Sequence, residues 1–144
     1  PAVPVFTPAD QKFEIGKGIL MNEGTDVTIV ATGHLVWESL VAAAELEKEG
    51  ISCEVINIHT IKPLDEEIIL NSVKKTGKIV TAEEHNILGG LGESVARVLA
   101  QKLPTKQAFV AVNDTFGESG TPSDLMKKYG IDSTAVIEKV KSLL

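Results

Sequence analysis

Apolar residues recur along this chain in two kinds of block, which alternate from about residue 13 to the C-terminus. Blocks of the first kind are short, nearly continuous and rich in β-branched residues, as is typical of strands covered on both faces of a sheet. Blocks of the second kind carry their apolar residues at helical spacing. This alternation predicts an α/β domain: a three-layer α/β/α sandwich around a mostly parallel sheet of about five strands.

Four of the strand-like blocks cover residues 27–32, 53–58, 78–82 and 109–112. A fifth block, at residues 13–21, contains Gly16 and Gly18, and it predicts a short, bent strand because interior glycines weaken strands. The turn residues 22–25 suggest a hairpin from this first strand into the next. The first strand is therefore expected to run antiparallel to the others.

Helix-like blocks follow each of the four longer strands. The first covers residues 36–49, and its expected apolar face consists of Val36, Trp37, Leu40, Val41 and Ala44. The second starts near Pro63 and ends before Gly77, with acids in its first turn and lysines in its last, where each suits the helix dipole. Further helices are expected from Glu93 to Leu103, from Thr121 to about residue 130, and from Ser133 onward.

The totals indicate one acidic globular domain. The chain has 144 residues, 43% hydrophobic and 24% charged, with a formal net charge of −6. The negative net charge argues against a surface that binds nucleic acid or an anionic membrane, because such surfaces carry clustered Lys and Arg. No run approaches the roughly 18 apolar residues of a membrane span, so a cytoplasmic location is expected. Residues 1–10 contain three prolines and are expected to form a linker or arm, which leaves residues 11–144 for the domain.

Cys53 is the one cysteine in the sequence. A single cysteine excludes an internal disulfide and any metal site that needs several cysteines. Because Cys53 lies within an apolar run, we expect a buried free thiol rather than a reactive one.

His34, His59 and His85 each lie just after an expected strand. In a parallel sheet all three would project from the same edge, where imidazoles could bind zinc or carry protons. Loop histidines also commonly cap helices or bond to backbone carbonyls, and no spacing of carboxylates and histidines here matches a known metal motif. We therefore favour the structural interpretation and assign no metal ligand.

The stretch from residue 78 to 103 carries the most functional-looking residues, placed in a loop after its strand, where open parallel sheets bind ligands and partners. Glu83, Glu84 and His85 put acid next to base. A glutamate could orient His85 or hold a cation, but ordinary charge contacts with water or a neighbouring domain explain the triplet better. A role for Glu84 and His85 in an interface is left open.

A glycine cluster, Gly89, Gly90 and Gly92, precedes the next helix, whose free N–H groups could bind a small anion. The spacing fits neither the dinucleotide-binding nor the P-loop pattern, and close packing of the helix on the sheet explains the glycines as well. In the loop that follows residue 112, Ser119 lacks the flanking glycines of a nucleophile elbow. Phe116, an aromatic residue in that polar loop, is expected to anchor in a partner or in the core.

Several stretches, taken in order, resemble the C-terminal domain of the transketolase family of thiamine diphosphate enzymes. They are residues 13–17, 23–33 and 61–65, the Glu-Glu-His triplet with the glycine cluster, and residues 114–120 and 128–131. The Asp-Thr-Phe-Gly-Glu-Ser-Gly sequence of residues 114–120, with the later Tyr-Gly-Ile segment, is most similar to transketolases whose C-terminal half can be a separate subunit.

The resemblance implies a five-stranded mixed sheet with one antiparallel edge strand, used for packing and dimer contacts. The parent enzyme would be a pentose phosphate pathway transferase that moves a two-carbon ketol unit between sugar phosphates with thiamine diphosphate and magnesium. The family's Gly-Asp-Gly motif for magnesium and diphosphate is absent from this sequence, so no catalytic residue, cofactor ligand or metal ligand is assigned here. The expected partners are the pyrimidine-binding and diphosphate-binding domains of the same enzyme, in a homodimer, and the fragment alone is expected to be inactive.

Two other interpretations remain open. Deoxyxylulose-phosphate synthases and the beta subunits of 2-oxo-acid dehydrogenases share this domain, so either could be the parent. Alternatively, the chain is a free-standing regulatory module that recognises a small anion at the glycine cluster and His85. The first alternative again places the chemistry in other domains, whereas the second places it in the loop after residue 82.

Overall fold

The computed structural model describes residues 14–86, 90–112 and 132–144. Its sheet has the strand order β1-β3-β2-β4-β5. The strands are β1 (Ile19–Asn22), β2 (Val27–Ala31), β3 (Cys53–Asn57), β4 (Ile79–Asn86) and β5 (Gln107–Val112). β1 runs antiparallel to β3 at one edge, and all other pairs are parallel. The predicted mixed sheet with one antiparallel edge strand is confirmed.

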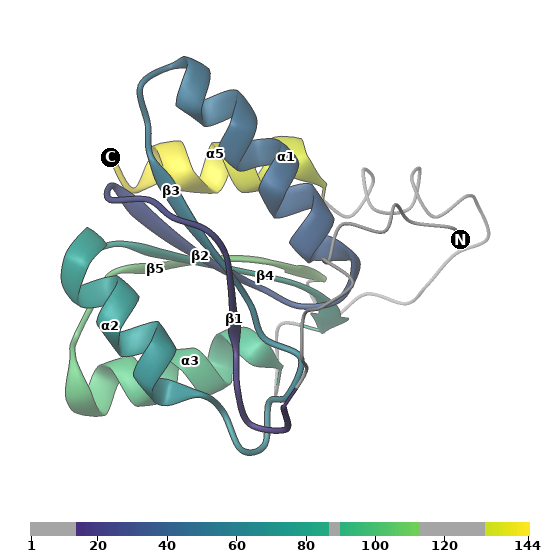
Figure 1. The fold of residues 1–144 in the computed structure, drawn as a ribbon, viewed down its shortest axis with the longest axis vertical. Helices are drawn as coiled ribbons and strands as arrows, with labels where there is room; N and C mark the ends of the chain where they lie inside the picture. The colour runs from purple at the N-terminus through teal and green to yellow at the C-terminus, as the bar shows by residue number, and fades with distance from the viewer. Residues whose placement is uncertain (1–13, 87–89, 113–131) are drawn as a thin grey trace.

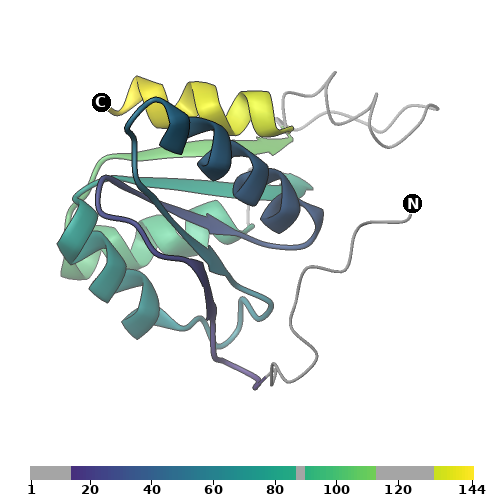
Figure 2. The same cartoon turned by 45° about the horizontal axis from the view of Figure 1, so that its top comes forward.

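Helices among the described residues cover both faces of the sheet. α1 (His34–Lys48) and α5 (Ser133–Ser142) pack together on one face, and α2 (Glu66–Thr76) and α3 (Leu91–Lys102) lie on the other (Figure 1). The turned view in Figure 2 shows the same three layers. The α/β/α sandwich is therefore as predicted. Among the described residues, no helix combines the length and apolar character of a membrane span.

Each face of the sheet has its own apolar core. Ile29 and Val55 pack toward α1 and α5, whereas their strand neighbours Val30 and Ile56 pack toward α2 and α3. Successive strand residues point to opposite faces, so a central strand covered on both sides is buried along its whole length. Every residue of β2 and β3 is buried accordingly.

The expected hairpin between the first two strands is wrong. β1 pairs with β3, and both edges of β2 are taken by β3 and β4. The turn after β1 instead crosses the start of β3, where Asn22 Nδ2 donates to the Cys53 carbonyl at 2.8 Å. Gly24 sits so close to this strand that an added Cβ would lie 2.2 Å from the Cys53 carbonyl carbon. The turn therefore needs glycine for contact with β3.

Two helices differ in detail from the sequence prediction. α1 begins at His34, and of the predicted apolar face only Val36 is fully buried, because the buried face of the helix also consists of Leu35, Ser39, Ala42, Ala43 and Leu46. Pro63 lies outside α2, which has Asp65 as its N-cap. The acidic first turn, the basic last turn and a left-handed Gly77 at the C-terminus of α2 are confirmed. The arm at residues 1–10 and the helix expected from Thr121 lie outside the described residues.

Candidate functional site

Strand β4 continues through Glu83, Glu84 and His85 as far as Asn86. The prediction that this triplet lies in a loop is therefore wrong. The pairing with β5 shifts register between Ala82 and Asn86, so the strand continues past an irregularity. Because adjacent strand residues point to opposite faces, the two glutamates are directed toward different helix layers.

Glu83 is completely buried and binds the start of α3. Its Oε1 atom accepts a hydrogen bond from Leu91 N, and its Oε2 atom accepts one from Gly92 N, each at 2.7 Å. The first N–H groups of a helix have no partner within the helix, and the positive end of the helix dipole favours an anion there. The carboxylate of Glu83 therefore occupies the position that a bound anion would take at these two N–H groups.

Close packing explains why residue 92 is a glycine. A Cβ at this position would lie 2.4 Å from the ring of Phe109 and 3.0 Å from Thr81 Oγ1. Gln107 Nε2 crosses the same junction and donates to the Gly92 carbonyl at 2.9 Å. The close-packing interpretation is thus supported for Gly92. Gly90 is the N-cap of α3, whereas Gly89 lies outside the described residues, and anion binding by the cluster stays a prediction.

Glu84 binds the other layer. Its Oε1 atom accepts a hydrogen bond at 2.9 Å from the backbone N–H of His34, the first residue of α1. The N-cap of that helix is Gly33, which has no side chain to supply a cap and adopts a φ of 61°. A strand residue fifty positions away therefore supplies the missing acceptor. The Glu83–Glu84 pair connects β4 to both helix layers.

Acidic side chains also hold the other two described helices. Asp65 Oδ1 accepts from Ile68 N at 3.3 Å in α2. At α5, Asp132 Oδ1 accepts from Ala135 N at 3.0 Å, and Glu38 Oε1 from α1 accepts from Ser133 N at 2.9 Å. In a parallel α/β fold the helices begin where the strands end, so these contacts gather at the carboxyl edge. At this edge, internal carboxylates bond to the start of every described helix.

The described histidine side chains bind within the chain. His34 Nε2 lies 3.7 Å from Glu38 Oε2, and His59 Nε2 lies 3.0 Å from the carbonyl oxygen of Glu14. The His59 contact with a backbone carbonyl is the kind that the structural interpretation expects, whereas His34 lies beside a carboxylate on its own helix. No group of three or more His, Cys, Asp or Glu side chains within the described ranges could hold a metal ion. The side chain of His85, and all of Phe116 and Ser119, lie outside the described structure.

Cys53 is 2% exposed and free. Burial, together with the nearby Asp26 carboxylate, raises the pKa of its thiol to about 11. The thiol is therefore protonated at neutral pH and poorly reactive. The prediction of a buried free cysteine is confirmed.

A second buried carboxylate, Glu54, escaped the sequence analysis. It is 4% exposed, accepts a hydrogen bond from Gly24 N at 3.2 Å and pairs with Lys75 Nζ. Burial alone would raise its pKa, but hydrogen bonds from Lys75, Ser72 and Gly24 and the charge of Lys75 lower the pKa below its usual value. A charged residue inside the apolar strand was the available signal. This network holds β3, α2 and the turn after β1 together.

The chain matches a known family over most of its length. The family model described as "Transketolase, C-terminal domain" matches residues 16–136. A 6-deoxy-6-sulfo-D-fructose transketolase subunit, SqwH, of Clostridium sp. (strain MSTE9) is 45% identical over 137 residues, which are 95% of this chain and 42% of the relative. A putative transketolase C-terminal section of Methanocaldococcus jannaschii is 45% identical over 129 residues, 89% of this chain and 40% of the relative.

Two further relatives also match nearly the whole chain. A 1-deoxy-D-xylulose-5-phosphate synthase of Desulfotalea psychrophila is 39% identical over 133 residues, 91% of this chain and 21% of the relative. A solved structure described as "Split gene transketolase, inactive beta4 tetramer" superimposes with a TM-score of 0.95 at 45% identity, and covers 99% of this chain and 46% of that chain. The chain thus spans less than half the length of these relatives. It belongs to the transketolase C-terminal domain family.

Proposed function

We propose that this chain is the C-terminal part of a thiamine diphosphate-dependent transketolase, and that it supplies architecture and subunit contacts rather than catalytic groups. The parent enzyme transfers a two-carbon ketol unit between sugar phosphates. Two relatives at 45% identity carry the names transketolase subunit and transketolase C-terminal section, and this chain corresponds to 42% and 40% of their lengths. The remaining part of such an enzyme has room for the catalytic domains.

The observation that carries this proposal is the use of the carboxyl edge of the sheet. Ligand sites of open α/β sheets depend on free helix N-termini and polar side chains at that edge. Here Glu83 and Glu84 direct their carboxylates to the N–H groups of α3 and α1. Groups that would bind a substrate in another α/β protein therefore bind the protein's own helices.

The described residues do not fit the cofactor of the family. Magnesium bound to a diphosphate prefers carboxylate and other oxygen ligands, yet no cluster of His, Cys, Asp or Glu in the described ranges could hold a metal ion. Glu83, the most buried carboxylate at the edge, is committed to two backbone N–H groups. We expect thiamine diphosphate and magnesium to bind to the pyrimidine-binding and diphosphate-binding domains, with this domain as their structural support.

Assembly with other subunits is part of the same proposal. The split-gene transketolase that this chain resembles was solved as an inactive beta4 tetramer. This supports the expectation that the present domain associates with copies of itself and is inactive without the diphosphate-binding partner. We expect a homodimeric arrangement in the active enzyme.

A chimera tests the proposal. Residues 14–144 would replace the corresponding domain in the related split-gene transketolase, which is then mixed with its diphosphate-binding subunit, thiamine diphosphate and magnesium. We expect ketol transfer from a ketose phosphate to an aldose phosphate in the mixture, and none from the 144-residue chain alone. Turnover by the chain alone would overturn the proposal, as would a fully assembled chimera that lacks activity.

One comparison supports a different parent enzyme as the alternative. The 1-deoxy-D-xylulose-5-phosphate synthase relative is 39% identical over 91% of this chain. The same chimera strategy in that enzyme, with mass-spectrometric detection of 1-deoxy-D-xylulose 5-phosphate, distinguishes the two parents. Higher activity in the transketolase background supports the first assignment, and higher activity in the synthase background supports the second.

A further inference from the structure

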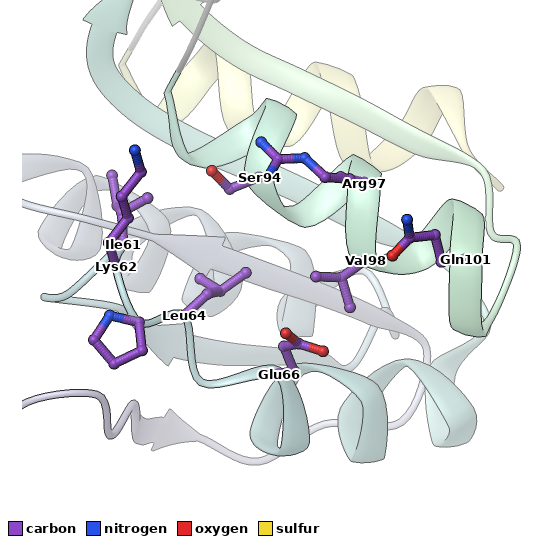
Figure 3. Close-up of a pocket in the computed structure, with 9 residues that line it drawn as sticks. Ile61, Lys62, Leu64, Glu66, Ser94, Arg97, Val98 and Gln101 are labelled. Atoms are coloured by element: carbon purple, nitrogen blue, oxygen red, sulfur yellow. The ribbon is translucent and has the colours of Figure 1, made fainter.

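A cleft of about 310 Å³ opens between the loop that joins β3 to α2 and the outer side of α3 (Figure 3). It lies in the α2–α3 layer, and none of its lining residues caps a helix in the contacts described above. Its walls contribute Lys62 from the loop and Ser94, Arg97 and Gln101 from α3. The volume is at the lower end of the range for small-molecule sites, roughly 300–1,000 Å³.

The cleft is positively charged although the chain is acidic. Lys62 and Arg97 are exposed, and within the described ranges neither has a carboxylate partner. Figure 3 shows their charged ends directed to the same side of the cleft. Glu66 is the one carboxylate among the described lining residues, and its Oε1 atom is bonded to Lys102 Nζ at 2.6 Å. Lys102 therefore balances the charge of Glu66. Lys62 and Arg97 are the two remaining cations at the cleft.

The rest of the lining suits a ligand with an anionic head and a small polar or apolar body. Leu64 and Val98 provide an apolar floor between the charged walls, and Ser94 and Gln101 provide neutral hydrogen-bonding groups. An arginine guanidinium binds phosphate through two parallel N–H donors, and a lysine adds a compact positive charge. This combination favours a phosphate monoester over a carboxylate, because the doubly charged head can engage both cations.

Hydrogen bonds within the chain hold both walls of the cleft in place without a ligand. The loop is fixed by the hydrogen bond from Gly18 N to Asp65 Oδ2 at 2.7 Å, and α3 is fixed by the buried Glu83 cap. We propose that this cleft binds the phosphate group of a small phosphorylated metabolite, with Arg97 and Lys62 as its ligands. The site is additional to the catalytic site of the parent enzyme and does not depend on the proposed function.

The test is an NMR titration of the 144-residue chain at constant ionic strength, with glucose 6-phosphate as the probe and glucose as the uncharged control. We expect saturable shifts of the Leu64, Ser94 and Val98 amide signals with glucose 6-phosphate and none with glucose. Arg97→Gln and Lys62→Gln should each weaken binding by about tenfold, equivalent to loss of one charged contact. Both side chains are exposed, so the variants should keep the wild-type spectrum.

Lys139→Gln is the matched control, because Lys139 is exposed on α5 in the opposite layer and the charge change is the same. It should bind the probe like the wild type. Equal weakening by Lys139→Gln would overturn the proposal, as would the absence of saturation below about 50 mM probe. Inorganic phosphate, titrated in parallel, separates the sources of the phosphate group: binding as tight as that of the sugar phosphate would overturn the metabolite assignment in favour of free phosphate.

Discussion

The Oε2 atom of Glu83 lies 2.7 Å from the backbone nitrogen of Gly92. A fully buried carboxylate at the end of β4 thus holds the first turn of α3, while its neighbour Glu84 holds the first residue of α1 on the opposite face. The two contacts convert the polar end of the strand into a connection between three layers. This arrangement explains why residues that look catalytic in the sequence have structural partners.

Removal of the Glu83 charge should destabilise the domain. In Glu83→Gln the side chain keeps its shape, but its amide nitrogen faces a backbone N–H group at a fully buried position. We expect the free energy of unfolding to fall by about 1.5–3 kcal/mol, the range for a hydrogen bond to a charged group. Urea unfolding followed by circular dichroism measures this loss.

Glu84→Gln is the matched control for that substitution. It removes the same charge one residue further along β4, but Glu84 is exposed and makes a single described contact with the backbone. We expect a much smaller loss of stability, because water can replace the contact. Equal losses in the two variants would contradict the assigned role of the buried cap.

Gly92→Ala should destabilise the junction between α3 and the sheet. The added methyl group would lie 2.4 Å from the ring of Phe109, so the ring or the helix must move. Overpacking of this kind costs about 1–3 kcal/mol. The double variant Gly92→Ala/Phe109→Leu should recover part of the loss, and a double-mutant cycle from urea unfolding measures the coupling. Strict additivity of the two single changes would show that the clash is not the cause.

Glu54 should make the free energy of unfolding vary with pH in the acidic range. Its pKa is lowered in the folded state from 4.5, so the unfolded chain binds the proton more readily. The contribution of the ionised Glu54 to the free energy of unfolding is complete above about pH 5.5, and it is lost as the pH falls through the lowered pKa. Wild type should therefore exceed Glu54→Gln in stability at neutral pH, and the difference should shrink as the pH falls below 4.5. Urea unfolding at several pH values provides the measurement, and a difference that grows in acid would contradict the pairing with Lys75.

Cys53 should resist modification while the domain is folded. Its thiol is buried, and its pKa is raised to about 11, so the reactive thiolate is scarce at neutral pH. Reaction with a chromogenic disulfide reagent should be slow in buffer and rapid in concentrated urea. Rapid labelling of the folded protein would show that β3 opens locally or that the thiol is accessible.

Much of the fold could be predicted from local sequence patterns. The apolar runs of β2 and β3 and the turn signals around α2 reflect interactions between near neighbours, and both appear in the structure. The partner of β1 could not be predicted in the same way. The pairing of β1 with β3 joins residues far apart in the sequence, and the close approach of Gly24 to the backbone of Cys53, 29 positions away, is a relationship that no local pattern encodes.

The candidate site was harder to predict than the fold. Glu83 and Glu84 resemble loop residues in the sequence because carboxylates are rare in the middle of buried layers. The burial of Glu83 becomes favourable only because the N–H groups at the start of α3 lie 2.7 Å from its carboxylate, and the exposed Glu84 finds its partner at the start of α1; both contacts are properties of the folded chain. The short spacing from Glu83 to the Gly-Leu-Gly sequence at the start of α3 was the available signal.

The most direct test of the central claim is the turnover of the reconstituted enzyme per assembled complex after changes at the carboxyl edge of this domain. The variants are Glu84→Gln, His59→Asn and His85→Asn, and the amount of complex is determined by native mass spectrometry. An architectural domain predicts turnover within about twofold of the unaltered enzyme, whereas loss of a general acid or base costs about 10²–10⁴-fold. A loss of that size in a fully assembled complex would contradict the account and would place a catalytic residue in this domain.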